Sequence, residues 1–74
     1  MRLYGYEEGS RSDQGPMRLS EVTLTASPAE LRAIARVLVD IASEMESASF
    51  DHVHLTDRVA QLSDSPELVV MRLD

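Results

Sequence analysis

The chain contains two histidines, which form an His-x-His pattern with an aspartate on either side: Asp51, His52, His54 and Asp57. On an extended segment, the two rings point to the same side and could share one divalent ion, with a carboxylate as third ligand. Metal sites usually draw their ligands from more than one segment, so this pattern is weak. The alternative is that one ring packs in the interior and the other is solvated. We therefore assign no metal ligand, keep His52 and His54 as candidates, and expect no cofactor.

Paired carboxylates are the next groups that could do chemistry, as a general acid and a general base. Glu7 and Glu8 are adjacent in a polar stretch, and Glu44 and Glu46 lie on the polar side of an expected helix. Solvent-facing carboxylates lack the desolvated environment that acid–base catalysis needs. The chain also has no cysteine, no nucleophile elbow and no glycine-rich loop before a helix. No catalytic residue is assigned, and we expect the protein not to be an enzyme.

Two tyrosines, Tyr4 and Tyr6, lie two residues apart and therefore on the same side of an expected first strand. Tyrosine suits a binding surface, because it provides a large contact area with little loss of conformational entropy. The alternative is that both rings cover a small core. The candidate partner-binding residues are aromatic, acidic or histidine side chains in two segments: Tyr4, Tyr6, Glu7, Glu8, Asp51, His52 and His54.

The charge of the chain restricts its partners. Thirteen acidic residues stand against seven basic ones, which gives a formal net charge of −6. This balance argues against binding to nucleic acid or to an anionic membrane surface, because both need cationic side chains. A protein partner with a basic surface is the natural complement, and solubility alone is the alternative. No apolar run reaches the ~20 residues that span a bilayer, and Met1 to Tyr6 does not resemble a secretory signal, so we expect a cytoplasmic protein.

One long amphipathic helix, from about Ser27 to Ala48, must position these groups. Its start is a capping box, with Ser27 as N-cap, Pro28 at the first helical position and Glu30 reaching back. Apolar residues follow at positions 31, 34, 35, 38, 41, 42 and 45, the spacing of a core-facing helix. We expect a sheet to cover this stripe.

Strands are expected on both sides of the helix, at residues 1–6, 17–26 and 67–73, with residues 50–66 as the connection before the last strand. Leu55, Val59 and Leu62 have the spacing of one helix face, which predicts a short helix over 56–62 that covers the end of the long one. The connection over 7–16 is rich in turn residues, which predicts a flexible hairpin loop. The last strand shows no alternation, which is typical of a strand buried on both faces. These elements predict one domain over 1–74, a two-layer α+β fold with a three-stranded sheet in the order β-β-α-short α-β. One sheet face stays uncovered and marks a homodimer or partner interface, unless twist and loops cover it.

Three stretches of the chain carry a family resemblance: Leu3 to Tyr6, Leu19 to Leu31 and Phe50 to Leu55. Together with the closing strand from Pro66 to Met71, their order and spacing resemble the immunity protein 32 family of bacterial polymorphic toxin systems. The resemblance implies an α+β fold and a non-enzymatic protein that binds and neutralises a cognate toxin. It implies no particular functional residue. Two alternatives remain open: a metal- or small-ligand-binding domain that uses His52 and His54, and a self-associating domain.

Overall fold

The computed structural model describes residues 1–9, 15–47 and 49–73. These ranges contain one α-helix, two short 3₁₀ helices and two antiparallel strand pairs. None of the helices in them is long and apolar enough to cross a bilayer. The elements follow one another as β1 (Leu3–Gly5), β2 (Met17–Leu19), α1 (Pro28–Glu44), β3 (His52–His54), η2 (Leu55–Asp57), η3 (Ala60–Leu62) and β4 (Val69–Met71).

The start of α1 confirms the predicted capping box. The Ser27 hydroxyl accepts a hydrogen bond from the backbone N–H of Glu30 at 3.1 Å, and the Glu30 carboxylate accepts one from the N–H of Ser27 at 2.8 Å. Two N–H groups that the first helical turn cannot satisfy are thereby paired. The helix ends at Glu44, before the predicted end at Ala48, which lies outside the described residues.

The predicted three-stranded sheet is wrong. The fold is α+β, but its strands form two separate two-stranded antiparallel sheets, β1–β2 and β3–β4. The expected second strand continues to Ala26, whereas β2 ends at Leu19 and a bend follows at Ser20. At this point the alternation of apolar residues changes phase. A single regular strand would therefore place Met17 and Leu19 on one face of the sheet and Val22 and Leu24 on the other.

The strand β3 lies where the sequence predicts only a connection. It pairs with β4 in the register His52↔Met71, Val53↔Val70 and His54↔Val69. The backbone N–H of Leu55 extends the ladder with a hydrogen bond of 2.8 Å to the carbonyl of Leu68. The helix predicted over 56–62 is instead the pair of 3₁₀ turns η2 and η3.

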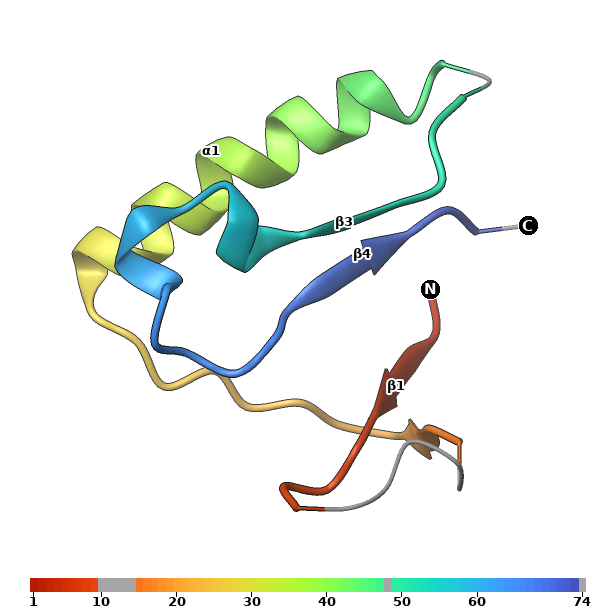
Figure 1. Cartoon of the computed structure of the whole chain (residues 1–74), viewed down its shortest axis with the longest axis vertical. Coiled ribbons are helices and arrows are strands. Elements are labelled where there is room, and N and C mark those ends of the chain that lie inside the picture. The colour runs from red at the N-terminus through yellow and green to blue at the C-terminus, as the bar shows by residue number, and fades with distance from the viewer. Residues whose placement is uncertain (10–14, 48, 74) are drawn as a thin grey trace.

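The core lies between α1 and the β3–β4 sheet with its two 3₁₀ turns (Figure 1). Val53 and Val70 are half-buried against it from the inner face of the sheet. Leu55, Val59 and Leu62 are all buried, as their spacing predicts, although the turns that carry them are not α-helical. The buried core residues are Ile34, Ile41, Leu55, Val59 and Leu62.

Four of the seven residues in the predicted apolar stripe of α1 are not covered. Leu31 and Leu38 are 46% and 42% exposed, and Ala35 and Ala42 beside them are exposed as well. We call these four residues the apolar flank. The expectation that a sheet would cover the whole stripe is wrong here, because a sheet of two strands is narrower than one of three.

The β1–β2 hairpin stands apart from the helix (Figure 1). It pairs Leu3 with Leu19 and Gly5 with Met17, as the predicted hairpin requires, and the centre of the loop over 7–16 lies outside the described residues. The Leu19 side chain packs directly over Gly5, so that a Cβ at this position would lie 2.9 Å from Leu19 Cδ1. The radius of gyration is 13.2 Å, larger than the roughly 11 Å of a compact chain of this length.

Candidate interaction surface

The outer face of the β3–β4 sheet, which turns away from α1, carries four partly or fully exposed side chains. Directly opposite residues of an antiparallel pair point to the same side, so His52 lies beside Met71 and His54 beside Val69. We call these four residues the histidine face. Its sequence signal was the alternation of His52 and His54 with Val53 and Leu55, which point to the core. The prediction that both rings point to one side is confirmed, whereas the prediction that the last strand is buried on both faces is wrong.

Each histidine of this face contacts a carboxylate through Nδ1. His52 Nδ1 lies 2.7 Å from Asp51 Oδ2, and His54 Nδ1 contacts Glu67 Oε2. The Thr56 hydroxyl donates a second hydrogen bond to Glu67, at 3.0 Å from Oε1. No role for Glu67 could be predicted from the sequence, because it is thirteen residues from His54 along the chain. Only the β3–β4 pairing brings the two together.

These contacts also affect the charge of Glu67. The hydrogen bond from His54 holds the pKa of Glu67 below its ordinary value, and the bond from Thr56 adds to the effect. Glu67 is therefore ionised at neutral pH. An ionised carboxylate can only accept hydrogen bonds, so the proton of the contact lies on His54 Nδ1.

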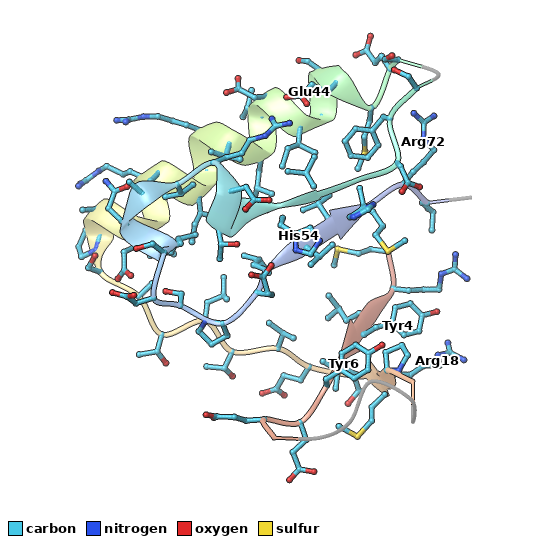
Figure 2. The ribbon with its side chains drawn as sticks, in the orientation of Figure 1. Tyr4, Tyr6, Arg18, Glu44, His54 and Arg72 are labelled. Atoms are coloured by element: carbon cyan, nitrogen blue, oxygen red, sulfur yellow. The ribbon has the colours of Figure 1, made fainter. Side chains whose placement is uncertain are left out.

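The other predicted partner-binding residues lie on a different part of the molecule. Tyr4 and Tyr6 are 50% and 55% exposed, beside Arg18 on the β1–β2 hairpin (Figure 2). Glu7 and Glu8 follow β1 and are exposed too. We call these four predicted residues the hairpin patch. Neither tyrosine is among the side chains that pack against the buried core.

A shallow, open hollow of about 410 Å³ lies beside His52, between the end of α1 and the start of β3. Arg58 donates two hydrogen bonds to the Glu44 carboxylate at its edge, one of them at 2.6 Å. These bonds hold the pKa of Glu44 below its ordinary value. Nearby, the Arg72 guanidinium lies 5.7 Å from the centre of the Phe50 ring. The first contact ties the end of α1 to the segment after η2, and the second ties the segment after α1 to the residue that follows β4.

Within the described ranges, no group of three histidine, cysteine or acidic side chains is placed to hold a metal ion. Asp57, the second aspartate of the predicted metal pattern, is exposed in η2. The carboxylates that meet the imidazoles are instead Asp51 and Glu67.

Comparison with known proteins supplies the identity that the geometry alone does not. No curated protein and no solved structure matches the chain significantly. The family described as immunity protein 32 matches residues 21–73. This match covers α1, both 3₁₀ turns and the β3–β4 sheet, and therefore the entire core. The chain belongs to the immunity protein 32 family.

Proposed function

We propose that this protein is a non-enzymatic immunity protein that binds a cognate toxin and blocks its action. The observation that carries the proposal is the family match over residues 21–73. A protein of this kind needs an exposed surface that is complementary to one partner, and it needs no catalytic group. The histidine face and the hairpin patch are the exposed surfaces that we consider for this role.

We assign toxin binding to the histidine face, because its composition resembles that of a protein interface. Val69 and Met71 form an exposed apolar centre, and the carboxylates of Asp51 and Glu67 lie at its edge. Interfaces combine an apolar centre with a polar rim in this way. The hairpin patch, with Tyr4 and Tyr6, provides a second contact area on the same protein.

The partner surface is expected to be basic. The chain carries a net charge of −6, and charge complementarity accelerates association and excludes wrong partners. Binding should therefore weaken as salt is added, because salt screens exposed charges beyond roughly 10 Å at 0.1 M. We also propose a cytoplasmic location, where the protein would meet a toxin that acts inside the cell.

Self-association is the second candidate, and the apolar flank of α1 favours it. Leu31 and Leu38 are large apolar side chains on an open helix face, and a second copy would bury them. Sedimentation velocity tests this directly. A homodimer that Leu38→Glu dissociates supports self-association, whereas a monomer at high micromolar concentration excludes it.

Calorimetric titration of the purified chain with the toxin domain encoded beside its gene tests the proposed function. We expect a one-to-one complex that Met71→Glu weakens at least tenfold, because the substitution places a charge at the apolar centre. The matched control is Val39→Glu on α1, where the side chain is similarly exposed, at 68% against 66% for Met71. The control should bind within about twofold of the unchanged chain. Absence of binding, or equal loss in both variants, would contradict the assignment of this face.

A further inference from the structure

We propose that His52 and His54 form a two-imidazole chelate for one divalent transition-metal ion on the outer face of β3. Each ring is oriented by a carboxylate, and water completes the coordination of the ion. This site does not depend on toxin binding, and its test uses the chain alone.

The strand places the two rings correctly for a shared ion. His52 and His54 are two residues apart on β3, so their side chains leave the sheet on the same side. Their ring centres are 5.2 Å apart, and the ring planes meet at 67° rather than stacking. In a tetrahedral zinc site, Zn–N bonds of about 2.0–2.1 Å put the centres of two imidazole ligands roughly 5 Å apart. The observed separation agrees with this value.

The hydrogen bonds of the rings leave the correct nitrogen for a metal. Both Nδ1 atoms contact carboxylates, at Asp51 and at Glu67. An ionised carboxylate only accepts, so Nδ1 carries the proton of each neutral ring and Nε2 carries the lone pair. Within the described part of the chain, no hydrogen bond occupies either Nε2. The lone pairs of both Nε2 atoms are therefore available to coordinate a metal ion.

A carboxylate on the second ring nitrogen is the usual companion of a metal-bound histidine. It fixes the tautomer and the ring orientation, and it makes the other nitrogen a stronger ligand. Glu67 is itself held by the Thr56 hydroxyl and comes from a separate segment. The side chains of His52 and His54 are 43% and 39% exposed, so an ion can reach them from solvent.

The donor set indicates which ions the site prefers. Two neutral imidazoles suit copper, nickel and zinc, and the affinity of nitrogen donors for these ions is greatest for Cu²⁺. Calcium and magnesium prefer oxygen ligands and are not expected to bind. Two protein ligands leave the remaining positions of the ion open.

Titration of the untagged, metal-free chain with Zn²⁺, followed by NMR of the imidazole groups, tests the proposal. We expect both histidines to shift together and to saturate at one ion per chain, with tighter binding of Cu²⁺ in a parallel calorimetric titration. His52→Asn and His54→Asn should each lose at least tenfold in affinity, because one imidazole cannot chelate.

Two further variants distinguish a preorganised chelate from two histidines that bind metal independently. Glu67→Gln should weaken Zn²⁺ binding by about tenfold, as changes to the carboxylate partner of a ligand typically do. Glu46→Gln, an exposed glutamate just after α1, should leave it unchanged and keeps the net charge of the two variants equal. Far-UV circular dichroism verifies that each variant is folded. Imidazole chemical shifts that do not change up to millimolar Zn²⁺ would overturn the proposal. Single-histidine variants that bind Zn²⁺ with undiminished affinity would overturn it too.

Discussion

At the scale of single residues, a few exposed side-chain pairs join segments that are far apart along the chain. His54 with Glu67 and Glu44 with Arg58 are such pairs, thirteen and fourteen residues apart along the chain. The sequence identified His54 as a candidate and placed Glu44 on a polar helix side. It could not reveal either partner, because the contact between two polar side chains depends on how separate elements pack. Local spacing carries no information on that packing.

The Glu44–Arg58 pair gives a prediction on pH dependence. Hydrogen bonds from Arg58 lower the pKa of Glu44 from 4.5 in the folded protein. A carboxylate whose pKa is lower in the folded than in the unfolded protein stabilises the fold at any pH above its unfolded pKa. This contribution disappears as the pH falls through the pKa of the folded protein. Glu44→Gln should therefore lower the urea midpoint at pH 7 and have little effect near pH 3. Urea unfolding at both pH values measures this, and an equal loss at both would contradict it.

At the scale of elements, local signals were predictable and pairing was not. The capping box at Ser27 lies within four residues, so the sequence alone located the start of α1. The spacing of Leu55, Val59 and Leu62 predicted a buried face, although not its 3₁₀ geometry. Strand pairing depends on residues far apart in the chain, and there the prediction of three strands in one sheet failed.

The capping box itself can be tested by substitution. Ser27→Ala removes the hydroxyl that accepts from the N–H of Glu30, so the helix should lose about 1 kcal/mol of stability. Ser43→Ala is the matched control, because the Ser43 hydroxyl is exposed in the last turn and makes only a long contact of 3.5 Å. Equilibrium urea unfolding compares the two variants. Equal midpoints for both would show that the cap does not stabilise the fold.

At the scale of the whole molecule, the core and the candidate surfaces belong to different parts of the structure. All buried core residues lie within the segment that the family match covers. The hairpin patch precedes that segment in the chain, and the histidine face lies on the side of the β3–β4 sheet that turns away from α1. Substitutions on these surfaces should therefore change binding without unfolding the protein. The amphipathic helix, the clearest feature of the sequence, contributes Ile34 and Ile41 to the core.

Survival of cells that produce the toxin tests the central claim most directly. A toxin encoded beside the gene is expressed with this chain, with Met71→Glu or with Val39→Glu, and the surviving colonies are counted. We expect the unchanged chain and Val39→Glu to restore growth, and Met71→Glu to protect poorly at an equal level of folded protein. Killing that the unchanged chain does not alter would contradict the account of this protein as an immunity protein.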